Sequence, residues 1–504
     1  MKVSERAPFS NRDRQVFVLN MESELDRGAL LSRYSRTSSL DIRDLYEKEF
    51  ENNPLRGREF YQRVFLEYGD ESVAELVTAQ VAVQDISNVV SKIIEESRTG
   101  LSFLEKSSRY VSYSKKREGK YLYLDFNHTG IDPSLEREYV DLMDNIFKVY
   151  SECIEPLQKE IKLEYPLEVK EGVDPLNMEK AYNSAVRARA LDDIRSILPC
   201  ATLTNVGISG NIRAFIYLIQ RLYASGIAEA DKIATMLLEE LSKDFNELLK
   251  SARGKYGDQN IDYLSKIKHS WNTESVGKKM NLEPESNLLA YSRENLEMLP
   301  VIFTSQNGGS SELTMPEIIR IISQNRKNRR NKLPRELEFI SLTYRINMNY
   351  GAFREFQRHR FMSIIRKEVG MDSGFQTPEF VKKTPEVREK YIMAMQSAKT
   401  LWEKVVRVNG KTLAQYVVPF GAMYSLTVAT NLRELVYFCE LRSTPQSHPD
   451  LRALAIQMMR EIVTKEPVLE PLFVFVDQGD YPLGRFDQEY KKEIKLRELG
   501  KGTE

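Results

Sequence analysis

The residues best suited to chemistry stand together in the second half of the chain, where positions 353–360 read F-R-E-F-Q-R-H-R. In this segment His359 lies between Arg358 and Arg360. An arginine side chain keeps its charge and offers a planar fork of donors that fits phosphate, and a histidine ring can stack or donate. The group suits a ligand that carries a phosphate and a flat heterocycle, although a solvated basic helix face has the same composition. The candidates for holding an anion here and in the flank are Arg354, Arg358, His359, Arg360, Arg366 and Lys367.

The overall composition limits the classes of protein that could carry this segment. The chain has 504 residues, of which 41% are hydrophobic and 29% are charged, and this is typical of a soluble globular protein. Lys plus Arg and Asp plus Glu both number 73, so the zero net charge argues against bulk binding to nucleic acid. The most basic run, N-R-K-N-R-R-N-K at 325–332, is interpreted as a solvated loop, with nucleic-acid binding as the alternative.

Cysteines, histidines and apolar runs exclude further classes. Cys153, Cys200 and Cys439 are far apart, so we expect reduced core residues of a cytosolic protein. The histidines lack metal-ligand spacing, so no metal site is predicted, and His269 and His448 are interpreted as ordinary surface residues. No run of 18 apolar residues occurs, and the polar start M-K-V-S-E-R is not a signal peptide. The sequence therefore predicts a cytoplasmic protein without a membrane span.

The elements that must position these residues are mostly helices. Short alternating runs at 16–19, 122–126 and 472–476 predict strands. The predicted fold class is therefore α+β. Helical periodicity predicts helices at 40–52, 58–67, 77–96, 135–161, 178–197, 211–223 and 228–249.

An internal repeat organises the chain. Pro199 is followed 12 residues later by Asn211, and Pro419 is followed 12 residues later by Asn431. After each Asn come an Arg two residues on and a Tyr six residues on, so several features agree in one register. We interpret this as two diverged copies of one domain, which would mimic a homodimer within one polypeptide. The predicted domains are an N-terminal copy over 1–250, a polar linker region over 251–287 and a C-terminal copy over 288–504.

The segment around His359 has a counterpart in the first copy. Without a gap, residues 97–99 (S-R-T) align with residues 358–360 (R-H-R). The first copy continues as G-L-S-F-L-E-K-S-S-R-Y to Tyr110, and the second as F-M-S-I-I-R-K-E-V-G-M to Met371. The two part-patterns resemble the signature of the flavin-dependent thymidylate synthase (ThyX) family, in which R-H-R is followed by Ser and the run ends in S-x-R-Y. The first copy keeps the tail (Ser102, Glu105, Ser107, Arg109 and Tyr110), and the second keeps the head (Arg358, His359 and Arg360).

Residues downstream are also similar to this family. Arg195, before L-P, matches its first arginine, and the second copy has Gln415 there. Arg442 matches its late nucleotide-binding arginine, and the first copy has Leu222 there. Glu355 stands where the family usually has a glutamine, which places a carboxylate near the nucleotide and weakens the case for dUMP.

The resemblance implies a fold and a site. Each copy would be a small antiparallel sheet with long flanking helices, and the two copies would form a pseudo-dimer. Because each copy lost a different half of the signature, we expect composite sites that combine residues of both copies. The resemblance implies that flavin is held by Arg358, His359, Arg360 and Asn431. It implies that the nucleotide is held by Glu105, Ser107, Arg109, Tyr110, Arg195 and Arg442, with Arg195 and Arg442 as the catalytic pair.

The resemblance also implies an activity. FAD, NADPH and methylenetetrahydrofolate would serve to convert dUMP to dTMP, or to methylate a related uridine nucleotide, with the flavin doing the redox work and the protein orienting the reactants. The losses in each copy leave open a second function, a non-catalytic flavin- or nucleotide-binding regulatory or partner protein. The expected partners are a nucleotide and a second copy of the chain, because a homodimer of the duplicated chain would mimic the family's tetramer.

Overall fold

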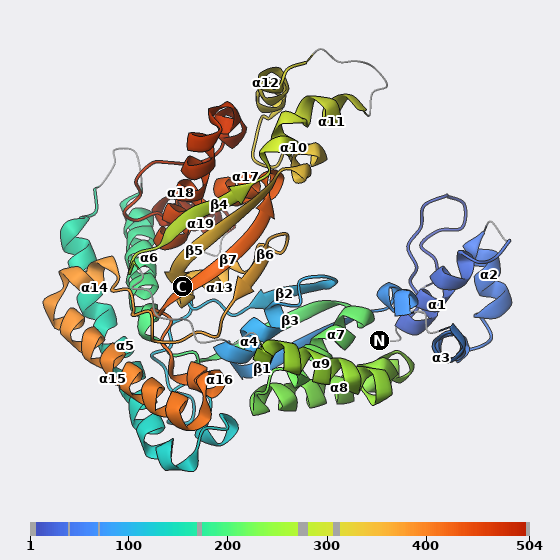
Figure 1. Cartoon of the computed structure of the whole chain (residues 1–504), viewed down its shortest axis with the longest axis horizontal. Helices are drawn as coiled ribbons and strands as arrows, with labels where there is room; N and C mark the ends of the chain where they lie inside the picture. Colours follow the sequence, from blue (N-terminus) through green and yellow to red (C-terminus); the bar gives the residue numbers. More distant parts are fainter. Residues whose placement is uncertain are drawn as a thin grey trace. The chain divides into compact units, whose positions relative to one another are not determined.

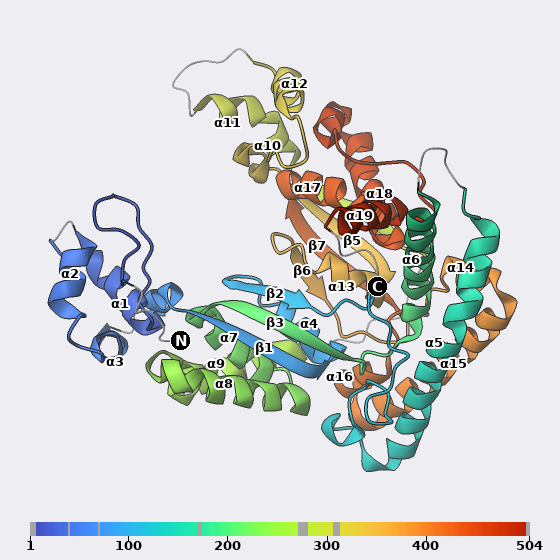
Figure 2. The same cartoon turned by 180° about the vertical axis from the view of Figure 1, so that it is seen from behind.

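The computed structural model describes residues 7–38, 41–68, 71–168, 174–270, 281–305 and 313–499. They form two compact units, and each contains a small antiparallel sheet and helices (Figures 1 and 2). Because residues 107–126 and 131–202 group with C-terminal residues, the units differ from the predicted domains, whose boundaries stay a prediction. Unit 1 consists of Met1–Lys106, Asn127–Gly130 and Leu203–Glu274, and unit 2 of Ser107–Phe126, Ile131–Thr202 and Ser275–Glu504.

Unit 1 is built on a three-stranded antiparallel sheet in the order β1-β3-β2. The helix after β1 begins at a serine cap, because Ser87 Oγ accepts from the Val90 amide at 3.1 Å. Asn211 caps the helix after β3 in the same way, accepting from the Ala214 amide at 2.8 Å. The strands are β1 (Thr78–Ser87), β2 (Leu101–Glu105) and β3 (Leu203–Asn211). The α-helices are α1 (Glu24–Tyr34), α2 (Ile42–Glu49), α3 (Arg56–Tyr68), α4 (Asn88–Glu95), α7 (Ile212–Tyr223), α8 (Ala228–Leu249) and α9 (Gly254–Ser270).

The predicted helix over 77–96 is wrong, because its first half is strand β1 and only its second half, α4, is helical. The pairing of β1 with β3 shifts register between Val83 and Ile86, and Asp85 adopts a positive φ of 54°. Such a bulge interrupts the alternation of a strand. The apolar positions on either side of it then fall at a helix-like spacing, which explains the error.

Unit 2 is built on a four-stranded antiparallel sheet in the order β4-β5-β7-β6. The strands are β4 (Glu285–Tyr291), β5 (Ser341–Asn349), β6 (Ser363–Arg366) and β7 (Met423–Asn431). The long helices are α5 (Glu136–Glu164), α6 (Pro175–Ile194), α15 (Pro385–Asn409), α18 (Pro449–Lys465), α12 (Met315–Asn325), α17 (Leu432–Arg442) and α19 (Phe486–Glu498). The shorter ones are α10 (Arg293–Glu297), α11 (Leu299–Ser305), α13 (Tyr350–Phe356), α14 (Glu379–Lys383) and α16 (Lys411–Ala414).

The two sheets confirm the predicted duplication. The order β1-α4-β2-β3-α7 recurs as β5-α13-β6-β7-α17, and in both copies further helices come before the third strand of the series, α5 and α6 before β3 and α14, α15 and α16 before β7. The pairing order recurs as well, β1-β3-β2 in one sheet and β5-β7-β6 in the other, with β4 added beside β5. The α+β prediction of two related copies, each a small antiparallel sheet with flanking helices, is therefore correct.

Two aligned segments of the copies pair with each other inside unit 2. The Cys200 amide donates to the Val418 carbonyl at 2.8 Å, and the Phe420 amide donates to the Leu198 carbonyl at 2.8 Å. A second pair of bonds, from Ala201 to Tyr416 at 3.0 Å and from Gly421 to Ser196 at 2.6 Å, is reciprocal in the same way. Each bond is matched by its counterpart with the copies exchanged, which is the pattern of a two-fold symmetric interface. We call residues 196–201 and 416–421 the reciprocal strip.

Other expectations for single segments need correction. Residues 122–126 contribute only the isolated bridge from Tyr123 to Thr202, and residues 472–476 overlap the 3₁₀ turn Pro467–Phe473, so neither is a strand. The predicted linker region contains α9 and part of β4. The basic run at 325–332 is a loop as expected, but Arg326 is buried and bonds both oxygens of Glu440 at 2.7 Å.

The three cysteines are buried and free, as expected of core residues. No helix in the described ranges has the length and apolar character to cross a membrane.

Candidate functional site

Five buried or half-buried arginine side chains gather in unit 2 from separate segments of the chain. Three of them pair with two carboxylates, one in the last turn of α6 and one on α13. Within this set the guanidinium groups outnumber the carboxylates, so the set favours an anionic ligand. We call it the arginine cluster; its members are Arg109, Arg195, Arg354, Arg442 and Arg485 with Asp192 and Glu355.

Asp192 holds two of these arginines. Its two oxygens accept from Arg109 Nε and Nη2, both at 2.8 Å, in the side-by-side geometry that makes an arginine–carboxylate pair strong. Arg485 Nη2 lies 3.1 Å from the Oδ2 atom of the same carboxylate. Burial raises the pKa of Asp192, but the charge and hydrogen bonds of Arg109, with Arg485, outweigh burial and hold the pKa well below its usual range. Asp192 is therefore ionised at any physiological pH.

Glu355 accepts hydrogen bonds from two arginines of the cluster. Its Oε2 accepts from Arg109 Nη1 at 3.1 Å, and its Oε1 accepts from Arg195 Nη2 at 3.2 Å. Burial raises the pKa of Glu355, but Arg109 and Arg195 oppose it and bring the pKa to about 2. The carboxylate thus occupies, in ionised form, the donors that would otherwise face a bound anion.

Ser108 links two more arginines. Its Oγ accepts from Arg354 Nη1 at 2.9 Å and from Arg195 Nη1 at 3.3 Å. The Arg354 guanidinium also lies 4.8 Å from the centre of the Phe420 ring, a cation–π contact. The cluster is therefore held in a defined geometry and is not a set of mobile surface charges.

His359 holds the remaining arginine. Arg442 Nε donates to His359 Nε2 at 2.8 Å, and Arg442 Nη2 donates to the Glu355 carbonyl at 3.2 Å. Because an arginine can only donate, His359 Nε2 must accept, and the ring proton is on Nδ1, which faces Glu434 Oε1 at 3.3 Å. Burial lowers the pKa of His359, with Glu434 opposing and Arg442 reinforcing this shift. A neutral His359 therefore fixes the orientation of Arg442.

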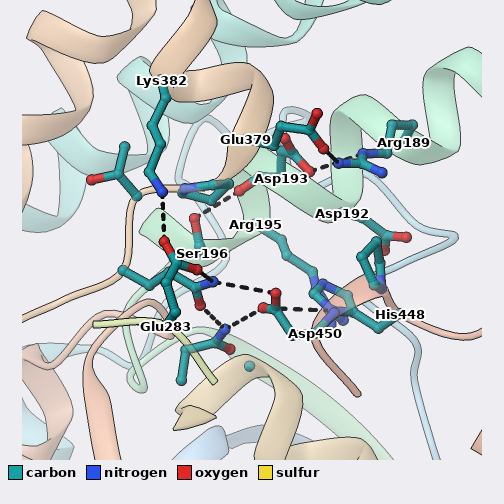
Figure 3. Close-up of a pocket in the computed structure, with 16 residues that line it drawn as sticks. Arg189, Asp192, Asp193, Arg195, Ser196, Glu283, Glu379, Lys382, His448 and Asp450 are labelled. Atoms are coloured by element: carbon teal, nitrogen blue, oxygen red, sulfur yellow. Dashed lines mark hydrogen bonds and ion pairs between the residues drawn. The ribbon is translucent and has the colours of Figure 1, made fainter. Parts of the chain in front are cut away.

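A cavity of about 260 Å³ adjoins the arginine cluster, because Asp192 and Arg195 form part of its wall (Figure 3). Asp193 is also in the wall, and burial raises its pKa to about 6 against the opposing effect of Arg189 and the Phe380 amide. The wall carries more carboxylates than cations, so the cavity favours a neutral or cationic group over a phosphate. Its charged residues are Asp192, Asp193, Glu283, Glu379 and Asp450 against Arg189, Arg195 and Lys382.

His448 lies in the wall of this cavity beside Asp450 (Figure 3). The ring is only 8% exposed, so the interpretation of His448 as an ordinary surface residue is wrong. Its Nδ1 accepts from the Asp450 amide at 3.3 Å, which caps α18. Asp450 accepts in turn from Asn349 at 2.6 Å and from Gln376 at 3.2 Å. The burial of His448 could not be read from its local sequence, since the covering residues come from distant segments.

Comparison with known proteins identifies the family. The family model described as "Thymidylate synthase complementing protein" matches residues 21–245 and 305–468. The chain belongs to this family. It is 43% identical to a protein of Thermoplasma acidophilum named only as a UPF0159 protein, over 94% of this chain and 99% of that protein. A UPF0159 protein of Chlamydia pneumoniae is 32% identical over 96% of each chain.

More distant relatives are named after an activity. The flavin-dependent thymidylate synthase of Thermococcus onnurineus is 30% identical over 28% of this chain and 62% of its own length. A solved structure of the UMP/dUMP methylase PolB from Streptomyces cacaoi, bound with 5-Br dUMP, is 20% identical and covers 38% of this chain and 96% of its own. Its TM-score of 0.33 is too low to support an argument about this chain.

The structure brings together most of the residues that the ThyX resemblance assigned to the nucleotide. Arg109 and Arg195 of the first copy meet Glu355 and Arg442 of the second copy in one cluster, all within unit 2. Tyr110 is exposed beside this cluster, under the Arg485 guanidinium at 4.5 Å. Ser107 Oγ accepts from the Arg109 amide at 3.3 Å. The expected mixture of residues from both copies is therefore present in the arginine cluster.

Glu105 is placed differently. It belongs to unit 1, where its carboxylate lies 3.0 Å from the buried Lys92 ammonium and accepts from Ser91 at 3.1 Å. These contacts use both of its oxygens, and a role for Glu105 in nucleotide binding stays a prediction.

The residues assigned to flavin have mixed surroundings. Arg358 and Arg360 are exposed on either side of the buried His359. Asn431 is the cap of α17, since its side-chain oxygen accepts from the Glu434 amide at 2.9 Å. Exposed guanidinium groups fit the phosphates of a dinucleotide, whereas both ring nitrogens of His359 already face protein groups.

Sequence reasoning missed Asp192 and Arg485. Asp192 precedes Arg195 in the same helical turn, but nothing local shows that it accepts from an arginine more than eighty positions away. Arg485 directly precedes the charged helix α19, and His269, whose side chain lies outside the described residues, adds nothing to the site.

Proposed function

We propose that this chain is a flavin-dependent enzyme that methylates a uridine nucleotide, converting dUMP to dTMP or acting on a close relative of dUMP. The observation that carries this proposal is the arginine cluster, in which Arg109 and Arg195 of the first copy meet Arg442 of the second. These are the positions that the ThyX resemblance assigns to the nucleotide. A composite site of this kind explains why neither copy needs the whole signature.

The arginines would act by charge and geometry. Arg109 and Arg195 would bind the nucleotide phosphate in exchange for part of their contact with Glu355, because a phosphate offers the same paired oxygens as a carboxylate. Arg442, held by His359, would donate to the uracil where negative charge develops, and a fixed donor needs no reorganisation during the reaction. The protein thus supplies binding, orientation and electrostatic stabilisation.

FAD, NADPH and methylenetetrahydrofolate are the proposed co-reactants. Bound FAD would supply the hydride chemistry, with NADPH as the reductant and methylenetetrahydrofolate as the carbon donor. Within this chain, the exposed Arg358 and Arg360 would hold the cofactor phosphates, and His359 would orient Arg442. Assembly as a homodimer stays a proposal of the same kind, and light scattering on the purified chain tests it.

One observation favours a second candidate function. Glu355 fills the site between Arg109 and Arg195 with an ionised carboxylate, whose pKa is about 2. A ligand phosphate must displace this internal anion. We therefore keep as the alternative a non-catalytic relative that binds flavin or a nucleotide and acts as a regulatory or partner protein.

The deciding experiment measures release of tritium from dUMP labelled at carbon 5, with FAD, NADPH and methylenetetrahydrofolate present. An enzyme releases tritium and shows a flavin absorption band. Arg109→Lys and Arg360→Gln should each abolish release, and Arg137→Gln should not, because Arg137 is 95% exposed on α5 and pairs with Asp141. A folded chain that binds flavin or nucleotide but releases no tritium from dUMP or UMP would establish the alternative.

A further inference from the structure

The last segment of the chain enters the arginine cluster from beyond the part that the family model matches, which ends at residue 468. Arg485 is 6% exposed, although it stands at the start of a strongly charged tail. Burial of a charged side chain requires partners that compensate for the loss of water. Arg485 therefore has a structural or functional role that its local sequence does not show.

Backbone contacts fix the position of Arg485. A Cβ atom on the preceding Gly484 would lie 1.9 Å from the Pro445 carbonyl oxygen, so only glycine permits this approach. Upstream, Arg452 donates to the carbonyls of Asp477 at 2.9 Å and Gly479 at 2.6 Å. Downstream, α19 packs on α6, the helix that carries Asp192. The segment is thus fixed by contacts both before and after Arg485.

Arg485 contacts both the backbone of Arg109 and the carboxylate that holds its side chain. Its Nη2 lies 3.1 Å from Asp192 Oδ2 and 3.4 Å from Oδ1, on the carboxylate that also holds Arg109. Its Nη1 lies 3.4 Å from the carbonyl oxygen of Arg109 itself. The guanidinium also covers the Tyr110 ring at 4.5 Å. Both the backbone and the carboxylate partner of Arg109 are therefore in contact with Arg485.

The charge balance shows what this contact does. Arg109 and Asp192 alone form a neutral pair, which has little attraction for an anion. With Arg485 on the same carboxylate, the three groups keep one net positive charge. Asp192 is then shared between two guanidinium groups, and the field at Arg109 stays attractive to a phosphate.

We propose that Arg485 is a positioning residue that keeps the surroundings of Arg109 positively charged for the phosphate of the nucleotide, by sharing Asp192 with it. This inference rests on the proposed function, since it takes the arginine cluster as the nucleotide site. The C-terminal segment that carries Arg485 is then part of the binding site, although it lies outside the matched part of the family.

The test compares a ligand that has a phosphate with one that lacks it. Binding of dUMP and of deoxyuridine to the full-length chain is measured by calorimetry, for the wild type and for Arg485→Gln. We expect dUMP affinity to fall by about tenfold or more and deoxyuridine affinity to change by less than about twofold, since one charge facing the phosphate is lost. Arg485→Lys should restore most of the dUMP affinity, because it keeps the charge.

A matched control separates this effect from net charge. Lys492→Gln removes one positive charge from the same segment, on a side chain that is 60% exposed, and should leave both affinities unchanged. An equal loss for dUMP and deoxyuridine in Arg485→Gln means that Arg485 only supports the fold, and no loss for either overturns the inference as well. A wild-type chain that binds no uridine nucleotide at all instead overturns the proposed function on which the inference rests.

Discussion

In the first copy, the helix after the first strand buries a lysine, and at the aligned position of the second copy the helix buries a phenylalanine. Lys92 on α4 is inaccessible to solvent and pairs with Glu95 and, at 3.0 Å, with Glu105. Phe353 on α13 is equally buried, and the Arg366 guanidinium, aligned with Glu105, lies 5.7 Å from its ring centre. Two sequences that share an ancestor's sheet thus fill the same place with an ion cluster in one copy and a cation–π pair in the other.

A similar difference between the copies affects the arginine cluster, because three of its arginines are each present in only one copy. The residues aligned with Arg109, Arg195 and Arg442 in the other copies are Gly370, Gln415 and Leu222. Gln415 is satisfied locally, since it accepts from the Val369 amide at 3.3 Å and donates to the Thr412 carbonyl at 3.0 Å, and Leu222 is fully buried. Gln415 and Leu222 are thus accommodated without an arginine in their own copy. We therefore expect one nucleotide site per chain.

The largest effect on this comparison should come from Arg195→Gln, which gives the first copy the residue that the second copy has at the aligned position 415. Arg195→Gln removes the guanidinium that pairs with Glu355 at 3.2 Å and would lower kcat/KM for methyl transfer by about a thousandfold, in the range found for loss of one fixed donor. Tritium release from dUMP measures this. The reverse change, Gln415→Arg, buries an unpaired charge, and it should destabilise the protein without adding a second site. Activity of Arg195→Gln within about tenfold of the wild type contradicts a single composite site.

Lys92→Met should break the ion cluster of the first copy without touching ligand binding. The substitution leaves Glu95 and Glu105 buried without their shared ammonium, and breaking a buried pair costs about 3–5 kcal/mol. Urea unfolding measures the loss, with Lys148→Met as control because Lys148 is 67% exposed. Reduced dUMP affinity in a folded Lys92→Met protein would show that the Lys92–Glu105 ion cluster itself takes part in binding.

Acid should destabilise the protein partly through Glu355 in the second copy. Its pKa falls from an ordinary value of 4.5 to about 2 on folding, so the stabilisation is present above pH 4.5 and is lost as the pH falls toward 2. The lost contribution amounts to about 3 kcal/mol. Unfolding measured at several pH values between 6 and 3 should show a shallower decline in Glu355→Gln than in the wild type. Parallel curves for the two proteins rule out Glu355 as a source of this pH dependence, because Asp192 is present in both.

The smallest expected effect tests whether the Glu355 carboxylate competes with the nucleotide. Glu355→Gln frees Arg109 and Arg195 from a competing anion and should raise dUMP affinity by about tenfold, a change of about 1.4 kcal/mol. Calorimetry with dUMP and with deoxyuridine measures this, and only dUMP should gain. Glu389→Gln, at an exposed position, is the matched control. Weaker binding of dUMP would mean that Glu355 helps the nucleotide site and does not compete with it.

The repeat could be predicted from the sequence because duplication leaves a visible register, and the resemblance to the family assigned Arg109, Arg195 and Arg442 to the site. Arg195 and Gln415 stand at the same offset as Asn211 and Asn431, and the retained asparagines both became helix caps. Register of this kind survives even where the side chains diverge. The resemblance to the family, and not this register, assigned Arg442 to the site.

Other features could not be predicted, because they depend on contacts between distant segments. Asp192 and Arg485 are 293 positions apart, and nothing near either one indicates the pair. The burial of His448 likewise comes from residues elsewhere in unit 2. Strand β1 was not predicted because its bulge breaks the alternation of side chains on which a strand prediction depends.

The reciprocal strip has a consequence for how the duplicated chain can evolve. In an assembly of identical subunits, any substitution in such a strip occurs on both sides at once, and the strip must also hold the subunits together at cellular concentration. Here the two sides are encoded separately, and the tether gives them an effective concentration on the order of millimolar or more. Each side can therefore change alone, as Cys200 and Phe420 at matching positions already have. The linked chain gains the asymmetry of a heterodimer without the need to sort two kinds of subunit.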